Sequence, residues 1–320
     1  MSVTMSVVIP VYNGAAFIAD TVRAALAQTV GKFEIVIVND GSSDSTLEQL
    51  APFGDAVKVI SIANKGVSNA RNVGILASTG QFIAFLDADD LWYPEKLERQ
   101  LEIMKRHSDI GFCCCNYASL NPITGDAATH FDQFIHDPEF VLDKKMADPL
   151  KVLIGYNFVG TCSNVMVRRD VLERTGLFDT RYRQAEDYEL WLRCAGETNF
   201  LLMSDVLLDK TKHETNLTNN FVETLEYHDM VLQELLRGPL IGARPHLKPT
   251  VRRAISTVRY AIGNRLFNRG QAGLGYGYFW SAWREEQSVS NALRLIGQAG
   301  KKTARLLLEA LKLREPIRER

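Results

Sequence analysis

Four continuous apolar runs in the first 90 residues constrain the fold of this chain more than any other feature. They cover residues 6–12, 34–39, 57–62 and 81–86. Apolar runs without alternation are typical of strands buried on both faces of a sheet. Helical spacing fills the gaps between them, for example at Phe17, Ile18 and Val22. The pattern predicts an α/β fold with a mostly parallel sheet and helices on both of its faces.

Polar side chains follow these runs at the points where the strands are expected to end. Tyr12, Asp40 and Asp87 lie at or just past such ends, and Arg71 lies on the first turns of a helix predicted over Val67–Ala77. In parallel sheets, ligands bind beyond the carboxyl ends of the strands. We therefore expect these four residues to share one site.

The turn Asp87-Ala88-Asp89 follows the fourth run directly. Two carboxylates around one small residue can hold Mg²⁺ or Mn²⁺ and leave positions open for phosphate oxygens. A metal there would neutralise a leaving diphosphate. The alternative is a helix N-cap before the helix expected over residues 93–107. Both interpretations hold together if Asp90 is the cap.

Asp40 and Arg71 have similar pairs of interpretations. The carboxylate of Asp40 can accept hydrogen bonds from a base N–H or a ribose hydroxyl; the alternative is a capping turn. Arg71 can bind a base carbonyl or a phosphate; the alternative is a solvated surface arginine. Lys65-Gly66, just before the helix of Arg71, can approach a diphosphate.

Four segments together resemble the successive signatures of family 2 glycosyltransferases of the bacterial type, which have the GT-A fold. The segments are Val7-Val-Ile-Pro-Val-Tyr-Asn13, Val38-Asn-Asp-Gly-Ser-Ser-Asp-Ser-Thr46, Asn64-Lys-Gly-Val-Ser-Asn-Ala-Arg-Asn72 and Phe85-Leu-Asp-Ala-Asp-Asp90. The resemblance extends from residue 6 to about residue 215. It implies a Rossmann-like GT-A domain that binds a nucleotide-diphospho-sugar, most often a UDP-sugar, with Mn²⁺ or Mg²⁺ as cofactor.

The resemblance also implies roles for individual residues. Pro10, Tyr12 and Asp40 would hold the base with help from Arg71. Asp87 would contact the ribose or the donor sugar, and Asp89 would hold the metal. The nucleotide-sugar site as a whole is expected to consist of Pro10, Tyr12, Asp40, Lys65, Arg71, Asp87, Ala88 and His213.

The acidic pair Glu186-Asp187 begins another predicted helix. Displacement at an anomeric carbon needs a base for the proton of the acceptor hydroxyl, and the resemblance nominates Asp187 for this role, with Glu186 as its catalytic neighbour. The alternative is an acidic first turn that is stabilised by the helix dipole. Trp191, one turn further on, is expected in the core, with a sugar platform as the alternative. His213 is either a ligand of the diphosphate or metal, or a surface residue.

The C-terminal part of the chain is basic. From Arg237 to Arg320 there are 17 Lys and Arg but 5 Asp and Glu, so this part carries 17 − 5 = +12, and a total of −1 leaves −13 for the first 236 residues. We predict a catalytic domain over 1–220, with a nucleotide-sugar-binding half (1–117) and an acceptor-binding half (118–220), and a basic helical region over 221–320. Arg252, Arg253 and Arg259, interleaved with apolar residues, suit an anionic membrane surface; packing on the catalytic domain or on another subunit is the alternative.

The predicted function is an inverting transfer of a hexosyl or N-acetylhexosaminyl group. Its acceptor would be a saccharide or lipid-linked saccharide in surface polysaccharide or glycoconjugate synthesis. The alternatives are a non-catalytic nucleotide-sugar-binding protein and a sugar nucleotidyltransferase; the latter lacks the Gly-rich loop that a triphosphate needs after the first strand. Nothing resembles a nucleic-acid recognition module. Five cysteines without metal-ligand spacing and no signal peptide predict a cytoplasmic location, free or peripheral on the inner face of the membrane.

Overall fold

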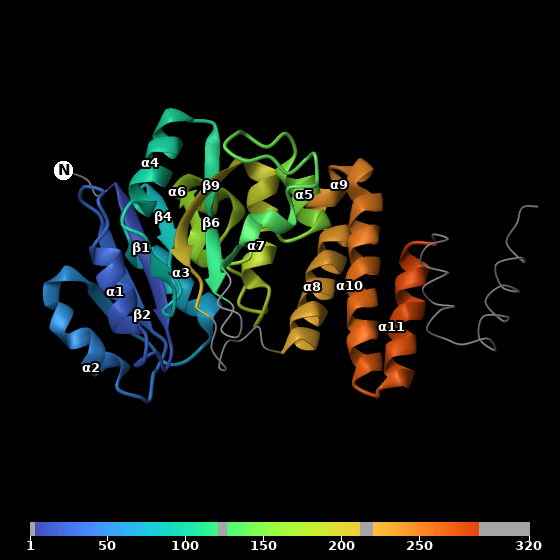
Figure 1. The fold of residues 1–320 in the computed structure, drawn as a ribbon, viewed down its shortest axis with the longest axis horizontal. Helices are drawn as coiled ribbons and strands as arrows, with labels where there is room; N and C mark the ends of the chain where they lie inside the picture. The colour runs from blue at the N-terminus through green and yellow to red at the C-terminus, as the bar shows by residue number, and fades with distance from the viewer. Residues whose placement is uncertain (1–3, 121–126, 212–219, 288–320) are drawn as a thin grey trace, which may run out of the picture. The chain divides into compact units, whose positions relative to one another are not determined.

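A computed structural model describes residues 4–120, 127–211 and 220–287. The chain divides into two compact units, Met1–Asn219 and Asn220–Arg320, and each is described by itself. Figure 1 shows their elements along the chain. His213 lies outside the described residues.

The first half of the sheet is parallel, as predicted. Its strands lie side by side in the order β3, β2, β1 and β4. The bounds are Lys58–Ser61 for β3, Glu34–Asn39 for β2, Met5–Val11 for β1 and Phe82–Phe85 for β4. Every residue of β1 and β4 is buried, which explains why these runs lack the alternation of a half-exposed strand.

The second half of the sheet is mixed. Beyond β4 the order continues through β8, β6, β9 and β5, and β7 pairs with β6. Only β6 and β9 are parallel to each other in this half; the other pairs are antiparallel. The bounds are Leu91–Trp92 for β5, Ile110–Leu120 for β6, Ala127–Thr129 for β7, Val165–Arg168 for β8 and Asn199–Asp209 for β9.

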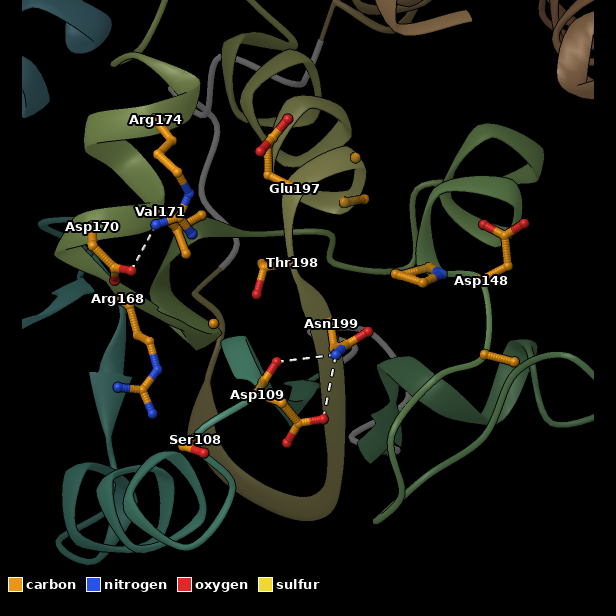
Figure 2. A pocket seen from close by; sticks show the side chains of 15 residues that line it. Ser108, Asp109, Asp148, Arg168, Asp170, Val171, Arg174, Glu197, Thr198 and Asn199 are labelled. Carbon is orange, nitrogen blue, oxygen red and sulfur yellow. Dashed lines mark hydrogen bonds and ion pairs between the residues drawn. The ribbon is translucent and has the colours of Figure 1, made fainter. Parts of the chain in front are cut away.

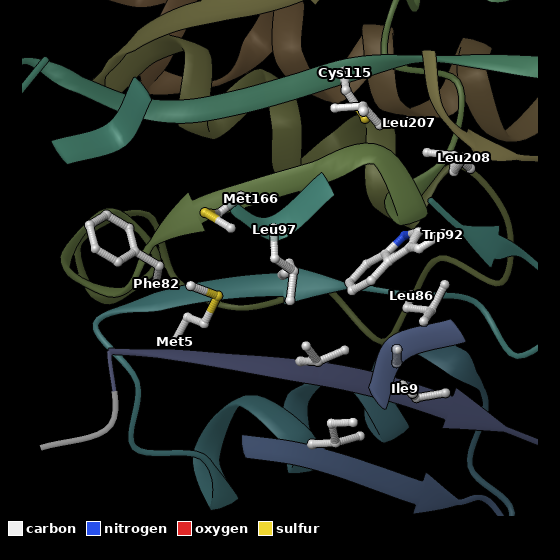
Figure 3. Close-up of a cluster of buried hydrophobic side chains, with 14 of the residues drawn as sticks. Met5, Ile9, Phe82, Leu86, Trp92, Leu97, Cys115, Met166, Leu207 and Leu208 are labelled. Carbon is white, nitrogen blue, oxygen red and sulfur yellow. The ribbon is translucent and has the colours of Figure 1, made fainter. Parts of the chain in front are cut away.

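Helices cover both faces of this sheet (Figure 1). Side chains of α1 (Ile18–Leu26) and α4 (Lys96–Arg106) pack with one face of β1 and β4, in the cluster shown in Figure 3. The opposite face packs on α3 (Val67–Ala77) and α7 (Glu186–Glu197). The remaining helices of the unit are α2 (Thr46–Leu50), α5 (Pro149–Gly155) and α6 (Arg169–Thr175). The α/β fold predicted from the apolar runs is thus confirmed.

Gly74 allows α3 to lie unusually close to the sheet. A Cβ atom at this position would lie 2.4 Å from Cγ1 of Val8 in β1, far inside van der Waals contact. Any larger residue would push α3 away from β1. The missing side chain at Gly74 therefore lets the backbone of α3 pack directly on the side chain of Val8.

Residues 220–287, the described part of the C-terminal unit, are helical, as predicted. Its helices are α8 (Phe221–Arg237), α9 (Pro239–Gly242), α10 (Lys248–Asn268) and α11 (Ala272–Glu285). Gly238-Pro239, Arg244-Pro245 and Gly270 lie at the breaks between these helices. Among the residues that the structure describes, no helix is both long and apolar enough to cross a bilayer.

The arginines of α10 are engaged inside this unit. Arg252 pairs with Glu285 at 3.2 Å, and Arg253 pairs with Glu286 at 3.1 Å. The apolar residues between them are buried rather than presented to solvent; they include Val251, Ile255, Ile262 and Leu266. These contacts lie inside the C-terminal unit, so membrane contact and packing on the catalytic domain or on another subunit stay predictions for α10.

Candidate active site

The acidic turn after β4 lies beside the segment that precedes β8. The backbone N–H of Asp87 donates to Oγ of Ser163 at 3.0 Å. The hydroxyl of Thr161 donates to Asp87 Oδ2 at 3.3 Å and to Asp90 Oδ2 at 3.4 Å. Asp87, Ala88 and Asp89 are half-buried, whereas Asp90 is buried. The hydroxyl groups of Ser163 and Thr161 therefore hold the turn in place.

Asp90 is not the helix cap that the sequence suggests. Strand β5 intervenes before α4, whose N-cap is Glu95. Oδ1 of Asp90 accepts a hydrogen bond from the backbone N–H of Thr211 at 3.1 Å. Burial, together with the negative charges of Asp87 and Asp89, raises the pKa of Asp90 to about 7. This carboxyl group fastens the end of β9 to the acidic turn.

Arg71 joins the acidic turn to the start of α7. Its Nη2 donates to Asp87 Oδ1 at 2.7 Å, and its Nη1 donates to Glu186 Oε1 at 2.6 Å. The guanidinium lies 5.3 Å from the ring centroid of Phe178, and its Nε is buried without a hydrogen-bond partner among the described residues. Arg71 is thus a buried bridge between two carboxylates, not the solvated surface arginine of the alternative interpretation. Its predicted contact with the nucleotide stays a prediction.

The two acidic residues at the start of α7 differ in their surroundings. Glu186 is buried against Arg71, and burial together with the charge of Asp187 raises its pKa to about 7 even though Arg71 opposes this shift. Asp187 is only half-buried. Both residues lie in the first turn of α7, where the helix dipole stabilises negatively charged side chains. The structure therefore places Glu186 as an ion-pair partner and leaves Asp187 as the more accessible carboxylate.

Asp40 holds the loop that precedes α3. Its Oδ1 accepts from the backbone N–H of Lys65 at 2.9 Å, and its Oδ2 accepts from that of Gly66 at 2.8 Å. Gly66 has a φ of 91°, a conformation that favours glycine. Each carboxylate oxygen keeps a second lone pair, so contact with a base stays a prediction for Asp40.

The loops after β1 and β2 are also tied together. The N–H of Asn13 donates to Ser42 Oγ at 2.9 Å, and that of Ala15 donates to Asp44 Oδ2 at 3.0 Å. Tyr12 is 55% exposed beside these contacts, whereas Pro10 is buried within β1. Lys65 is exposed. Tyr12 thus directly follows β1, and Lys65 lies between β3 and α3; their contact with a nucleotide stays a prediction.

The charge of the acidic turn fits a divalent cation. Asp87, Asp89 and Asp90 repel one another strongly enough to contribute to the raised pKa of Asp90, and a cation on Asp89 would offset that repulsion. Within residues 4–120, 127–211 and 220–287, no three His, Cys, Asp or Glu side chains form a ligand set. Mg²⁺ sites often use one or two carboxylates and complete the shell with phosphate oxygens and water. The donor set therefore suits a metal that arrives with a diphosphate.

A second group of side chains on this part of the fold escaped sequence analysis. Tyr117 stacks on His130, with ring centroids 4.4 Å apart. Burial, and further the charges of Asp90 and Asp187, raise the pKa of Tyr117. Nζ of Lys210 donates to the carbonyl of Gly160 at 3.0 Å. Tyr117 therefore lies within electrostatic reach of both the acidic turn and α7.

Thr161, Ser163 and Thr211 were likewise not predicted as part of the site. Their partners lie 71–121 residues away in the sequence, so no local spacing reveals them. The one available signal is the short polar run Thr161-Cys-Ser-Asn164 immediately before β8. Trp191 is fully buried and packs against Phe85 and Phe112, which rules out the sugar platform. The five cysteines are buried and free.

A separate polar pocket of about 490 Å³ lies at the opposite end of the sheet (Figure 2). Arg168 lines it and pairs with Phe82 at the start of β4, whereas Asp87 follows the end of that strand. The charged groups of this pocket are engaged locally, for example Arg174 with Asp170 at 2.8 Å and Arg168 Nε with the carbonyl of Ile110 at 2.8 Å. It does not contain the residues predicted for the site.

Comparison with known proteins agrees with this geometry. Residues 6–176, more than half of the chain, match the model of the family described as Glycosyl transferase family 2. The Escherichia coli UDP-Glc:alpha-D-GlcNAc-diphosphoundecaprenol beta-1,3-glucosyltransferase WfgD is 29% identical over 244 residues, which cover 74% of this chain and 88% of that protein.

Solved structures show the same fold at low sequence identity. Staphylococcus aureus TarS 1–349 in complex with UDP-GlcNAc superposes with a TM-score of 0.67 at 18% identity, covering 98% of this chain and 93% of that one. The mannosyltransferase PcManGT from Pyrobaculum calidifontis, in complex with GDP-Man and Mn²⁺, gives 0.59 at 17% identity, covering 98% and 87%. The fold is therefore GT-A, and this chain belongs to glycosyl transferase family 2.

Proposed function

We propose that this glycosyltransferase moves a sugar from a UDP-sugar to a lipid-linked saccharide, with inversion at the anomeric carbon, in the synthesis of a surface polysaccharide or glycoconjugate. The observation that carries the proposal is the bridge of Arg71 between Asp87 and Glu186. It brings the carboxylate expected at the donor sugar to the helix turn that carries Asp187. The donor and acceptor classes follow those in the name of WfgD.

In this proposal Asp187 is the catalytic base. It takes the proton of an acceptor hydroxyl while that oxygen attacks the anomeric carbon of the donor. The bond from this carbon to the diphosphate oxygen breaks with its electron pair, and the nucleoside diphosphate leaves. One displacement with one base inverts the configuration. Glu186, which is buried against Arg71, positions the turn and does not exchange protons with the acceptor.

Asp89 would hold Mn²⁺ or Mg²⁺. The ion supplies Lewis acidity that neutralises the charge on the leaving diphosphate. Asp87 and Ala88 would contact the ribose or the donor sugar, and Lys65 would approach the diphosphate. Pro10, Tyr12 and Asp40 would hold the base. Residues 1–117 thus form the nucleotide-sugar half of the proposed catalytic domain 1–220, and residues 118–220 form the acceptor half.

A ligand screen tests the donor part of the proposal. Purified protein is heated with UDP, GDP, UDP-glucose, UDP-GlcNAc and GDP-mannose, each with and without Mn²⁺. We expect UDP compounds to raise the melting temperature only with Mn²⁺, because a ligand that binds the folded state alone stabilises it. Asp89→Ala should abolish the metal-dependent shift. A shift of equal size without metal, or a preference for GDP-mannose, would overturn the metal or the donor assignment.

The same preparation separates the competing functions. A transferase releases UDP from the preferred donor when an acceptor such as N-acetylglucosamine diphosphate on a short lipid is added. Pyrophosphate release from UTP and a sugar phosphate would instead identify a nucleotidyltransferase. Binding without turnover on any acceptor would identify a non-catalytic nucleotide-sugar-binding protein. The intact set Asp87, Asp89 and Asp187 favours the transferase.

A lipid-linked acceptor also leads us to propose peripheral membrane contact through the C-terminal region. On α11, Leu274 is 63% exposed and Trp280 is 43% exposed, and such residues suit the interfacial layer of a bilayer. We expect the full chain to co-sediment with vesicles that contain 30% anionic lipid, at low salt. Trp280→Ser should weaken this binding severalfold, with Leu76→Ser, a similarly exposed residue of α3, as the control. Equal binding of both variants would contradict the proposal.

A further inference from the structure

One face of α3 contacts the segment leading to α7 at three regularly spaced points. The side chain of Asn72 is bonded twice to the backbone of Phe178: Nδ2 donates to the carbonyl at 2.8 Å, and Oδ1 accepts from the N–H at 2.9 Å. Ser68 Oγ donates to the carbonyl of Tyr182 at 3.3 Å. The bridge from Arg71 to Glu186 forms the third point.

The spacing of these contacts follows from helical geometry. Positions i, i+3 and i+4 of a helix lie on one face, and residues 68, 71 and 72 have this spacing. The contacted residues 178, 182 and 186 are four apart along the opposite segment. Three backbone groups and one side chain are thus held by a single face of α3. The residue that follows the last contact is Asp187.

The segment adopts a conformation that needs such support. Ala185, the N-cap of α7, has φ 59° and ψ 18°, which is the left-handed region. A non-glycine residue in this region is strained and persists where the surrounding structure over-determines its conformation. The side chain of Glu186, directly after it, is bound to Arg71. The turn that presents Asp187 is therefore fixed by α3 rather than by its own preference.

Helix α3 is itself fixed relative to the nucleotide side of the site. The N–H of Gly66, its N-cap, donates to Asp40. Gly74 lets the helix approach β1 closely, and Arg71 contacts Asp87. A displacement of the 178–186 segment relative to α3 would thus change the distance between Asp187 and a donor held at Asp87.

We propose that Asn72 and Ser68, together with Arg71, are positioning residues that set the place of Asp187 relative to the bound donor. This inference rests on the proposed function, in which Asp187 is the base. Asn72 and Ser68 act through the backbone of residues 178–182 and touch no substrate. Their loss therefore lowers kcat, because misplacing a reacting group by about 1 Å can cost 100-fold in rate, and leaves donor binding at Asp40, Asp87 and Asp89 intact.

The test compares Asn72→Ala with Asn199→Ala. Asn199 is a matched control, because its Nδ2 also donates to a backbone carbonyl, that of Asp109, at 3.1 Å, but at the far end of the sheet. Release of UDP from UDP-glucose with Mn²⁺ and a lipid-linked N-acetylglucosamine diphosphate gives kcat, and calorimetry with UDP and Mn²⁺ gives Kd. We expect Asn72→Ala to lower kcat at least tenfold with Kd changed less than twofold, and Asn199→Ala to change neither.

Two further variants keep the inference testable if Asn72→Ala folds poorly. Ser68→Ala removes one contact and should lower kcat about two- to threefold with unchanged Kd. Asn72→Asp should lose kcat near neutral pH and regain part of it, relative to the wild type, at lower pH, because a protonated carboxyl can both accept from and donate to Phe178. Parallel losses of kcat and donor affinity, or wild-type kcat in all three variants, would overturn the inference.

Asp187→Asn in the same assay separates this inference from the proposed function. If Asp187→Asn retains full activity, Asp187 is not the base and both assignments fail. If Asp187→Asn is inactive while Asn72→Ala is fully active, the base assignment stands and only the positioning role is wrong.

Discussion

Arg71 and Arg259 are both buried, and each forms ion pairs with two acidic residues. Arg71 bonds Asp87 at 2.7 Å and Glu186 at 2.6 Å. Arg259 bonds Asp229 at 2.8 Å and Glu285 at 3.1 Å. The guanidinium suits both places, because its planar fork can serve two carboxylates while staying charged.

The two bridges differ in what they join. Arg259 connects α10 to α8 and α11, so its partners all belong to the packing of the C-terminal helices. Arg71 connects the turn after β4 to the start of α7, beside Asp187. The same ionic arrangement thus joins helices in one unit and joins parts of the proposed reaction site in the other. Replacements at three positions, taken from the largest expected effect to the smallest, test and sharpen this difference.

Replacement of Arg71 should have the largest effect. Arg71→Met leaves the buried Glu186 and the half-buried Asp87 without their counter-ion, and breaking a buried ion pair typically costs about 3–5 kcal/mol of unfolding free energy. We also expect kcat to fall about 100-fold, because Asp87, which is expected to contact the donor sugar, and the turn that carries Asp187 lose their common partner. Urea denaturation and UDP release measure the two effects. Arg71→Lys should recover part of the stability but little of the activity, since a point charge cannot hold both carboxylates in the same geometry.

Replacement of Arg259 should affect stability alone. Burial raises the pKa of Asp229, and Arg259 opposes this shift. Arg259→Met removes this partner and should cost about 3–5 kcal/mol of unfolding free energy in the C-terminal unit. We expect kcat, measured well below the melting temperature, to stay within twofold of the wild type. A loss of kcat as large as that of Arg71→Met would erase the proposed difference between the bridges.

Lys96 sharpens the comparison, because it is a buried cation with no carboxylate bonded to it in the described structure. Its Nζ donates to Gln100 Oε1 at 2.7 Å and lies 4.0 Å from the ring centroid of Trp92. Burial lowers its pKa from 10.5 to about 8, although Cys115, Cys113 and Cys114 oppose the shift. The folded state therefore binds the proton less tightly than the unfolded state does.

The expected pH dependence follows from that difference. Between pH 8 and pH 10.5 the unfolded chain keeps more protons at Lys96 than the folded chain does, so the contribution of this residue to the unfolding free energy rises with pH. Below pH 8, burying the charged Lys96 lowers the unfolding free energy by about 3 kcal/mol, independently of pH. Lys96→Met should remove this slope and stabilise the protein near pH 7 by up to that amount. Urea denaturation of both proteins from pH 7 to 10 gives the difference. A constant difference across this range would contradict the lowered pKa.

The parts of the fold that sequence analysis found are those with local signals. Strands β1 and β2 are continuous apolar runs because both of their faces are covered, and Asp40 and Asp87 follow such runs. Strand β9 was not predicted, although Phe200-Leu-Leu-Met203 carries the same signal. The short β5 was also missed. It lies just before the helix predicted over residues 93–107, and its pairing with β9 depends on residues more than 100 positions away.

The site residues also divide into those with a local sequence signal and those without one. The carboxylates were found from their positions after strands, but the bridge of Arg71 to Glu186 joins residues 115 positions apart. Neither the hydrophobic period nor local spacing contains that pairing, which depends on how Trp191 of α7 packs on Phe85 and Phe112 of the sheet. Helix α10 shows the opposite outcome. Its amphipathic pattern was visible in the sequence, but its apolar side faces α8 and α11.

The rate of Asp187→Asn is the most direct test of the central claim that Asp187 is the base of an inverting transfer. Asparagine keeps the size of the side chain and cannot accept the acceptor's proton. UDP release with donor, Mn²⁺ and acceptor at saturation, together with calorimetric Kd for UDP and Mn²⁺, gives both quantities needed. We predict a fall in kcat of about 1,000-fold with Kd within twofold. A kcat within a few fold of the wild type would contradict the claim.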